Sequence, residues 1–229
     1  MDVSVIIPAY NEAKGIEKTL RALRAQDPDE IIVVDNNSRD GTAKIAGKYA
    51  DLLLSQKKHG AAASRNLGAA RAKNSVIAFL DADCVPEKGW VEAVRKGFTG
   101  KTVGLTGPIS PHGGRIKDRA AFFLSWSIMS RFFIGIRQPA FPGGNCAYDQ
   151  KVFLEAGGFR TDVIPGEDIE MSRRIRKEGR LRYSGDMKVS TRTARYDEYG
   201  YLSEIGKWLR VFWSMGMKEG WKYPYPDLR

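Results

Sequence analysis

The chain has 229 residues, of which 42% are hydrophobic, so it is long enough to bury a sizeable core within one α/β domain. Its formal net charge of +10 at pH 7 favours an anionic partner, such as nucleic acid, an acidic membrane surface or a phosphorylated substrate. The two cysteines, Cys84 and Cys146, lie in different segments, which argues against a disulfide framework and for free thiols in a reducing compartment. The N-terminus lacks the pattern of a signal peptide, and no apolar run reaches the roughly 20 residues that span a bilayer.

Strand and helix patterns alternate through the first half of the chain. The expected strands cover residues 3–7, 30–35, 52–54 and 75–81, and the clearest expected helix covers residues 61–72. We expect the first strand to end at Pro8 and the helix that follows it to be capped by Asn11. A turn at Gly41 marks the entry to another helix. Buried strands that alternate with helices predict an α/β fold, with a mainly parallel, right-handedly wound sheet and flanking helices.

Polar clusters follow three of the expected strands. They are "PAYNE" (8–12), "DNNSRDGT" (35–42) and "DAD" (81–83). Parallel α/β sheets bind ligands at the carboxyl ends of their strands, so we expect these clusters to share one site. Neither of the common glycine-rich phosphate loops occurs in the sequence. We therefore expect a phosphate group at this site to be neutralised by a divalent cation held by carboxylates.

The acidic pair of "DAD" offers the ligands for such a cation. Asp81 and Asp83 point the same way if the segment is extended, because side chains alternate along a strand. Two carboxylates so close together repel each other unless a cation lies between them, and oxygen ligands suit Mg²⁺ or Mn²⁺. The alternative is a solvated acidic turn, since short acidic motifs are common by chance. The apolar strand in front of the pair and the neighbouring clusters favour the metal site.

Six motifs together resemble the family 2 inverting glycosyltransferases, which have the GT-A fold. The motifs are "VSVIIPAYNE", "IIVVDNNSRDGT", "RNLGAARA", "VIAFLDAD", "FPGGNCAYDQKVFLEAGGF" and "GEDIEMSRRIRKEG", and they span about residues 1–190. The resemblance implies a Rossmann-like, mainly parallel sheet and a metal-dependent transfer of a sugar from a nucleotide-diphospho-sugar. It implies one compact domain with a nucleotide-sugar-binding half (1–100), an acceptor-binding and catalytic-base half (101–190) and a C-terminal amphipathic helical tail (191–229).

The resemblance also assigns the donor site. The residues assigned to donor binding are Pro8, Ala9, Tyr10, Glu12, Asp35, Arg65, Asp81, Ala82 and Asp83, and the metal ligands are Asp83 and Asp81. By this resemblance, Asp35 matches the residue that reads the nucleobase. A carboxylate that accepts a hydrogen bond from a ring N–H makes a specific contact. Uracil and guanine both offer such an N–H, and we favour UDP-sugars over GDP-sugars. The structural alternatives are a turn residue for Asp35 and a solvated helix face for Arg65.

The second half of the chain is expected to supply the chemistry. Asp168 matches the general base, which would accept the proton of the incoming acceptor, and Glu167 would orient Asp168 or touch the acceptor. The segment Gly143, Gly144 and Asn145 would approach the sugar or the acceptor, because glycine lets the backbone come close. Acidic residues also stabilise the first turn of a helix, and a Gly-Gly pair also forms tight turns.

Two departures from the family pattern limit the reaction. The Q-x-x-R-W run that many members carry is missing after Asp168, which argues against processive synthesis of a polymer. No histidine follows Asp168, so the further metal ligand of some relatives is absent, replaced by water, or replaced by phosphate contacts from Arg192 or Arg195.

The acceptor is expected to be a hydroxyl or a phosphate group, with a lipid-linked phosphate as one alternative. Two apolar and basic stretches of the chain give the indications about it. Residues 119–137 and 199–226 are typical of amphipathic helices, and with the net charge they favour a peripheral contact with a membrane. Packing on the sheet or a homodimer contact explains either stretch alone. We expect a cytoplasmic protein, at the inner face of the cell membrane if the acceptor is lipid-linked. The alternatives are an enzyme like the polyprenyl-phosphate mannose or glucose synthases and a non-catalytic protein that binds nucleotide-sugars or a membrane surface. No nucleic-acid motif occurs, so we expect no nucleic-acid partner.

Overall fold

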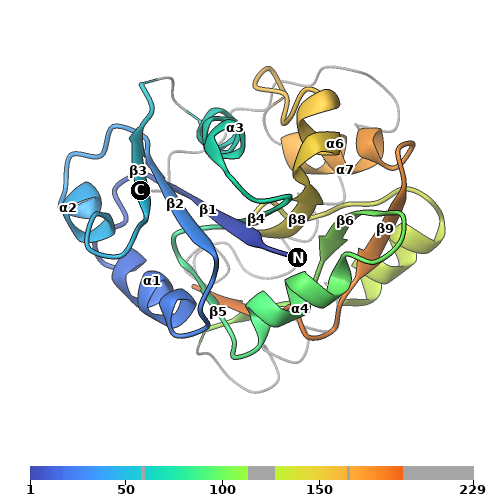
Figure 1. Ribbon diagram of the computed structural model, residues 1–229, viewed down its shortest axis with the longest axis horizontal. Coiled ribbons are helices and arrows are strands. Elements are labelled where there is room, and N and C mark those ends of the chain that lie inside the picture. Colours follow the sequence, from blue (N-terminus) through green and yellow to red (C-terminus); the bar gives the residue numbers. More distant parts are fainter. Residues whose placement is uncertain (58–59, 113–126, 164–165, 193–229) are drawn as a thin grey trace.

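The computed structural model describes residues 1–57, 60–112, 127–163 and 166–192 (Figure 1). Within these residues a central β-sheet lies between two layers of helices. The expected helix at 199–226, the first part of the expected helix at 119–137, and Arg195 lie outside the described residues.

Seven strands form the central sheet, in the order β3-β2-β1-β4-β8-β6-β9. They are β1 (Val3–Ala9), β2 (Glu30–Asp35), β3 (Leu52–Ser55), β4 (Val76–Leu80), β6 (Thr102–Thr106), β8 (Asn145–Asp149) and β9 (Arg180–Tyr183). Strand β8 runs antiparallel to both of its neighbours, and the other pairs are parallel. The expected mainly parallel α/β sheet is confirmed, and the strands expected in the first half lie close to their predicted bounds.

A helix layer covers each face of the sheet, so the strands bury side chains on both faces. One layer contains α1 (Ile16–Arg24) and α4 (Trp90–Gly97), and the other contains α3 (Ala61–Arg71), α6 (Gln150–Glu155) and α7 (Glu167–Ile175) (Figure 1). Val5 and Ile7 of β1 belong to the core cluster under α1 and α4, whereas Ile6 between them belongs to the cluster under the other layer. This alternation follows from the two-residue period of a strand. Helix α2 (Thr42–Ala46) packs beside α1, and a further helix covers residues 127–135.

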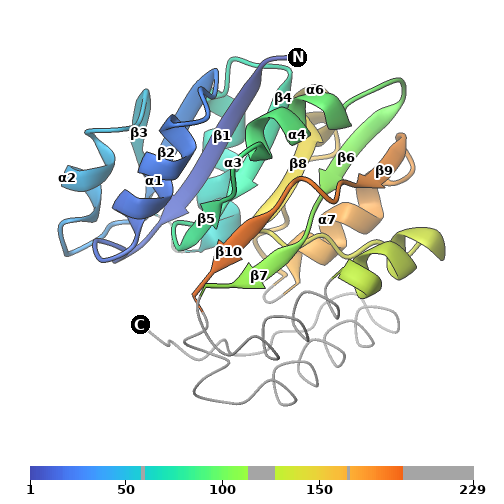
Figure 2. The same ribbon diagram turned by 90° about the horizontal axis from the view of Figure 1, so that it is seen from below.

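A smaller sheet, which the sequence did not predict, lies on the side of α1 and α4 (Figure 2). Its strands are β5 (Cys84–Pro86), β10 (Val189–Thr191) and β7 (Ile109–Pro111), in that order. Strand β10 pairs antiparallel with β5 and parallel with β7. Each strand has only three residues, which is too short for the period-two pattern that identifies a strand in a sequence.

The prediction that β1 ends at Pro8 was wrong. The strand continues to Ala9, and Pro8 lies opposite Val34 of β2. On its other side, β1 pairs with β4 only as far as Ile6. Proline cannot donate to a ladder, and its position beyond the last β4 partner is one where that donor is not needed.

The prediction that Asn11 caps α1 was also wrong. Helix α1 begins at Ile16 with Gly15 as its N-cap. Asn11 instead has a φ of 53°, a left-handed conformation that asparagine tolerates better than most residues. Its side-chain oxygen accepts a hydrogen bond of 2.9 Å from the N–H of Arg39, so Asn11 ties the first loop to the second.

Both cysteines, Cys84 and Cys146, are buried and unbridged, as the sequence predicted. In the part of the chain that the structure describes, no helix combines the length and apolar character needed to cross a bilayer.

Candidate active site

The polar clusters of the sequence meet at the carboxyl edge of the central sheet. Strands β1, β2 and β4 run parallel, so the loops that follow them leave the same edge. Ala9 pairs with Asp35, and the N–H of Asn36 donates to the carbonyl oxygen of Ala9 at 2.8 Å. This contact holds the first two loops side by side.

Asp35 ends β2 with one carboxylate oxygen engaged and the other without a partner. The residue is 8% exposed, and its Oδ2 accepts a hydrogen bond of 3.1 Å from the N–H of Ser38. Its Oδ1 is buried and has no hydrogen-bond partner among the described residues. Buried polar atoms in proteins are nearly always paired, so this oxygen is a place where a ligand N–H is expected. The turn role and a nucleobase role therefore use different oxygens of Asp35.

The first loop brings an acidic and a basic side chain together. Tyr10 and Glu12 are both half-buried, and the N–H of Glu12 donates to Thr42 Oγ1 at 2.8 Å. Glu12 Oε2 lies 3.7 Å from Nη2 of Arg192, which directly follows β10. A Cβ at Gly15 would overlap the Arg192 guanidinium, so the guanidinium lies directly against the backbone there. The structure thus brings Arg192 to the first loop.

Two of the predicted donor-binding residues, Ala9 and Ala82, expose almost none of their side chains. Ala9 and Ala82 are 3% and 4% exposed, and Pro8 is half-buried within β1. The carbonyl oxygen of Ala82 accepts a hydrogen bond of 2.9 Å from Thr19 Oγ1. Ala9 and Ala82 thus offer a ligand backbone atoms rather than side chains.

The acidic pair after β4 has the chemistry of a divalent-metal site. One ligand atom from each of Asp81, Asp83 and Cys84 lies within 4.8 Å of the others. Burial, and then the charges of Asp83 and Asp81, raise the pKa of the Cys84 thiol well above its usual value, so the thiol stays protonated. A protonated thiol is a poor ligand for a hard cation, whereas partly exposed carboxylates are suitable ligands for Mg²⁺ or Mn²⁺. The two aspartates fit a divalent metal, and Cys84 does not.

Arg65 connects this acidic pair to the start of α7. The residue is 5% exposed, and its guanidinium lies 2.7 Å from Asp81 Oδ1 and 3.2 Å from Glu167 Oε1. Burial lowers the pKa of Arg65, but the attraction of Asp81 and Glu167 outweighs this effect and raises the pKa, so the side chain remains a cation. The guanidinium also lies 5.7 Å from the ring centre of Phe159. Arg65 is therefore not on a solvated helix face.

Asp168 is a buried carboxyl in the first turn of α7. It is 8% exposed, and its two oxygens accept hydrogen bonds of 2.8 Å from the N–H groups of Gly143 and Ile169. Burial, followed by the charge of Glu167, raises its pKa to about 7, while the charge of Arg65 acts in the opposite direction. A carboxyl with such a pKa can exchange a proton near neutral pH.

Gly143 and Gly144 allow the turn before β8 to pass close to the charged groups. A Cβ at Gly143 would lie 2.9 Å from the guanidinium of Arg65, and one at Gly144 would lie 2.5 Å from Asp81 Oδ2. The same turn donates the N–H of Gly143 to Asp168. The tight turn and the close approach are thus the same feature. The turn lies beside the carboxylate of Asp81 and donates a hydrogen bond to that of Asp168.

Asn145 does not have the exposed side chain that a sugar or acceptor contact requires, so its predicted role needs correction. The residue is fully buried, and its Oδ1 accepts a hydrogen bond of 2.9 Å from Trp90 Nε1. Its Nδ2 donates to the carbonyl oxygens of Pro108 at 3.2 Å and Met187 at 2.9 Å. Each of its polar atoms is therefore used inside the protein, and Asn145 supports the turn rather than the ligand.

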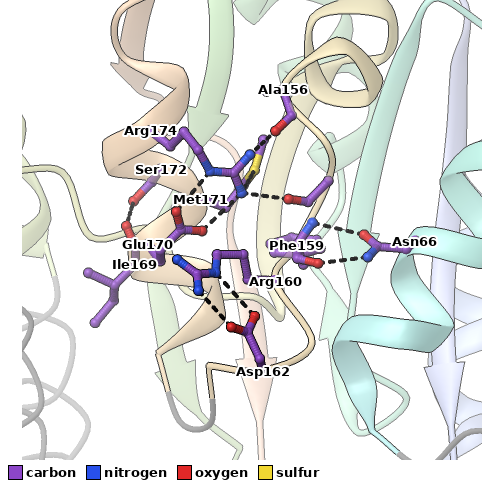
Figure 3. Close-up of polar contacts among 11 residues, drawn as sticks. Asn66, Ala156, Phe159, Arg160, Asp162, Ile169, Glu170, Met171, Ser172 and Arg174 are labelled. Atoms are coloured by element: carbon purple, nitrogen blue, oxygen red, sulfur yellow. Dashed lines mark hydrogen bonds and ion pairs between the residues drawn. The ribbon is translucent and has the colours of Figure 1, made fainter. Parts of the chain in front are cut away.

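Two contacts that the sequence analysis missed link α3 and α7 through the segment of residues 156–159 (Figure 3). Asn66 donates to the carbonyl oxygen of Phe159 at 2.7 Å and accepts from its N–H at 2.9 Å. Arg174 pairs with Glu170 at 2.8 Å and donates to two carbonyl groups of the segment 156–158. The asparagine of "RNLGAARA", next to Arg65, is the signal from which the first contact could have been expected. Together they fix the helix that carries Asp168.

The sequence model of glycosyl transferase family 2 matches residues 4–156. The chain belongs to this family. It is 33% identical over 191 residues to glycosyltransferase AglE of Haloferax volcanii, covering 77% of the chain and 62% of that relative. It is 30% identical over 196 residues to the pre-mycofactocin glycosyltransferase of Mycobacterium tuberculosis, covering 80% of the chain and 41% of that relative. This family 2 chain thus spans less than two thirds of the length of either relative.

Solved structures confirm the GT-A type of fold for this family 2 chain. The mannosyltransferase PcManGT of Pyrobaculum calidifontis, solved with GDP-Man and Mn²⁺, matches with a TM-score of 0.70 and 22% identity over 97% of the chain and 65% of that protein. The glucosyl-3-phosphoglycerate synthase of Mycobacterium tuberculosis, solved with Mn²⁺, UDP and phosphoglyceric acid, matches with a TM-score of 0.60 and 21% identity over 92% of the chain and 78% of that protein.

Proposed function

We propose that this chain is a metal-dependent, inverting glycosyltransferase that moves a sugar from a nucleotide-diphospho-sugar to a hydroxyl or phosphate acceptor. One observation carries the proposal: a continuous set of contacts runs from Asp81 through Arg65 to Glu167 and the neighbouring Asp168. It joins a pair of metal-binding carboxylates to a buried carboxyl with a pKa of about 7. A leaving group and an incoming nucleophile need these two kinds of group within one site.

The donor would lie along the carboxyl edge of the sheet. The unpartnered Oδ1 of Asp35 would accept the ring N–H of the nucleobase, and Tyr10 and Glu12 of the first loop would contact the nucleoside. Uracil and guanine both carry such an N–H, and we favour UDP-sugars. The relatives solved with UDP and with GDP-Man are consistent with either nucleobase.

Asp83 and Asp81 would hold Mg²⁺ or Mn²⁺ against the diphosphate. When bound, the ion stabilises the negative charge that develops on the departing nucleotide. Arg65 keeps Asp81 oriented through its 2.7 Å ion pair, and Arg192 brings a second positive charge to the first loop. The two solved structures described above, the mannosyltransferase PcManGT and the glucosyl-3-phosphoglycerate synthase, both contain Mn²⁺, which supports a metal of this type.

Asp168 would act as the general base. Its ionised carboxylate accepts the proton of the acceptor as the acceptor oxygen attacks the sugar, on the face opposite to the departing diphosphate. A single displacement of this geometry inverts the configuration at the reacting carbon. A positioned base of this kind contributes roughly 10²–10⁴-fold in rate. Glu167 and the turn at Gly143 and Gly144 would lie next to the acceptor or the sugar.

A lipid-linked acceptor, as in an enzyme like the polyprenyl-phosphate mannose or glucose synthases, is favoured by one surface feature. Ile128, Phe132 and Ile136 are 56%, 58% and 49% exposed and recur every four residues, so they form one apolar face on the helix of residues 127–135 and the turn after it. Arginines at 131 and 137 flank this face, as in a helix that lies in a membrane interface. In vesicle flotation, Phe132→Ser should reduce binding, whereas Leu154→Ser, which replaces an exposed apolar side chain outside this face, should not. Equal binding of both variants would remove this argument.

A screen of nucleotide-sugars with Mn²⁺ tests the proposal. We expect Asp83→Ala to weaken donor binding strongly, because a metal ligand is lost, and Asp168→Asn to bind the donor normally but to lose transfer by roughly 10²–10⁴-fold. Asp186→Ala, at an exposed carboxylate away from the site, is the matched control. Full activity of Asp168→Asn would show that Asp168 is not the base. Donor binding by the wild type without turnover of any acceptor would favour a non-catalytic nucleotide-sugar-binding protein.

A further inference from the structure

A second charged site lies away from the donor site, at the edge strand β9. A cavity of about 550 Å³ is lined by arginines from three segments: Arg137 after the helix of residues 127–135, Arg176 at the end of α7, and Arg180 and Arg182 on β9. The helix of residues 127–135 lies beside β9 in both ribbon views (Figures 1 and 2). Thr99 and Thr102 complete the polar part of the wall.

The cavity is separate from the candidate active site. Thr102 and Arg180 begin β6 and β9, so the cavity lies at the amino ends of these strands, whereas the donor loops leave the carboxyl edge. Arg176 and Asp168 lie at opposite ends of α7, which places them about 12 Å apart along the helix axis at 1.5 Å per residue. None of the groups assigned to catalysis lines the cavity.

The four arginines of the cavity have no acidic partners within the described part of the chain. Among the residues that the structure describes, none of them forms an ion pair with a carboxylate. Arg174, two residues before Arg176, pairs instead with Glu170. The lining residues of the cavity also include no aspartate or glutamate. The positive charge of this cavity is therefore not neutralised by the described part of the protein.

Two of the arginines are held in place by uncharged groups. Arg182 Nη1 donates to the carbonyl oxygen of Gly97 at 3.0 Å and to Thr99 Oγ1 at 2.9 Å. Arg176 Nη1 donates to the carbonyl oxygen of Arg137. These contacts position the guanidinium groups and leave further N–H donors for a ligand, because each guanidinium carries five.

A purely structural role explains only part of this arrangement. A basic residue at the end of α7 interacts favourably with the helix dipole, which accounts for Arg176. Arg180 and Arg182 belong to a strand, and Arg137 belongs to a different segment, so the dipole does not account for them. Burial lowers the pKa of Arg173, and the charge of Arg176 lowers it further, so the positive charge of Arg176 is felt at this neighbouring arginine.

We propose that this cavity binds the phosphate group of an organic phosphate ester. Arginine matches the geometry of phosphate oxygens with paired N–H donors. The Thr99 hydroxyl accepts a hydrogen bond from Arg182 and keeps its own proton as an uncharged donor, whereas the Thr102 hydroxyl donates to the carbonyl oxygen of Thr99. The volume exceeds that of a lone phosphate and lies in the range of small-molecule sites, and Ile134 and Leu181 offer an apolar wall for the organic part. The ester is either a free metabolite or the headgroup of a lipid, because both present the same chemistry. The proposal does not depend on the proposed glycosyl transfer.

The experiment uses the full chain in EDTA without nucleotide, so that metal-dependent binding at the donor site does not contribute. One arm titrates inorganic phosphate and sn-glycerol 3-phosphate by calorimetry. The other arm measures flotation with vesicles of phosphatidylcholine alone and of equimolar phosphatidylcholine and phosphatidic acid. The variant Arg137→Gln/Arg180→Gln removes two charges whose side chains make no hydrogen bond that the described fold needs. Arg71→Gln/Lys88→Gln removes two exposed charges elsewhere and serves as the matched control.

We expect the Arg137→Gln/Arg180→Gln variant to bind about tenfold more weakly in the arm where the wild type binds, because charge-assisted hydrogen bonds are lost, while the control stays close to wild type. Binding in the soluble arm identifies a free phosphate ester, and binding only to acidic vesicles identifies a lipid headgroup. Equal loss in both variants, or no binding in either arm, overturns the proposal. A wild-type measurement guards against misfolding of the variant: the ligand should protect Arg180 from phenylglyoxal, and unchanged modification of Arg180 also overturns the proposal.

Discussion

Asp168 is a buried carboxyl with a raised pKa, which affects both its proton exchange and the stability of the fold. Burial and the charge of Glu167 raise its pKa from 3.8 to about 7, so the folded protein favours the protonated form. Asp168 accepts hydrogen bonds from the backbone N–H groups of Gly143 and Ile169, which orient the carboxylate but do not neutralise its negative charge. A carboxyl of this kind is about half ionised at neutral pH, and its ionised form is more basic than an ordinary carboxylate.

The first prediction is the pH dependence of transfer. Only ionised Asp168 can accept the proton, so kcat/KM should fall about tenfold per pH unit below pH 7 and level off above it. The profile is measured with saturating Mn²⁺ and one donor. Replacing Glu167 by Gln removes a charge that raises this pKa, so the midpoint should move to lower pH. A profile that is flat from pH 5 to 8 at constant metal occupancy would contradict the role of Asp168 as base.

The second prediction concerns the stability cost of the same group. Between about pH 4 and pH 7 the unfolded chain has released the Asp168 proton and the folded protein still holds it, so the free energy of unfolding decreases as pH rises through this window. Above pH 7 the full cost of burying the charge is present, up to about 4 kcal/mol at 1.36 kcal/mol per pKa unit. Asp168→Asn has no such charge and should therefore gain stability relative to wild type between pH 4 and pH 7. Urea unfolding of both proteins at pH 4 and pH 8 measures the difference between their free energies of unfolding. A difference that does not grow from pH 4 to pH 8 would contradict the prediction.

At the scale of elements, the turn before β8 decides how closely the site is assembled. Its two glycines let the backbone pass beside Asp81 and Arg65, and its backbone N–H reaches Asp168. This turn thereby lies against Asp81 at one end of the candidate site and contacts Asp168 at the other. A side chain in this turn would disturb the site without removing any of its charged groups.

The third prediction tests this turn with Gly144→Ala. The new Cβ would lie 2.5 Å from Asp81 Oδ2, so the carboxylate must move away and its metal affinity should fall about tenfold or more. Gly135→Ala is the control, because a Cβ there meets nothing within 4 Å. Titration of Mn²⁺ in the presence of a nucleoside diphosphate provides the affinities. If both variants bind Mn²⁺ as the wild type does, the turn does not set the position of Asp81.

The elements differ in how far the sequence predicts them. The buried runs that become β1, β2 and β4 carry enough β-branched residues to predict strands, and the polar clusters behind them predict the edge where Asp35, Asp81 and Asp83 lie. The small sheet of β5, β10 and β7 could not be predicted, because its pairs join residues far apart in the chain. Arg65 and Asn145 show the same limit, because their contacts depend on partners that only the fold brings to them. Arg65 pairs with Asp81 and Glu167. Asn145 binds the indole N–H of Trp90 and the carbonyl groups of Pro108 and Met187.

At the scale of the whole molecule, Asn145 connects the two sheets. It begins β8 in the central sheet, while Pro108 and Met187 lie just before β7 and β10 of the small sheet. Its amide donates to both of these carbonyl groups and accepts from Trp90 at the start of α4. Because Arg192 directly follows β10, the position of this arginine beside the first loop depends on how the small sheet is held.

The last prediction is the effect of Asn145→Ala. The change leaves the Trp90 N–H and two carbonyl groups buried without a partner, at about 1–3 kcal/mol for each group that finds no replacement. We expect a loss of about 3–5 kcal/mol, or roughly 10 °C in Tm for a chain of this size. The exposed Gln138→Ala also removes an amide and should leave the Tm nearly unchanged. Hydrogen exchange adds the specific readout: protection should fall first in β7 and β10, while β1 and β2 keep theirs until global unfolding. Equal loss of protection in all strands would show that Asn145 stabilises the core in general and does not specifically join the small sheet to it.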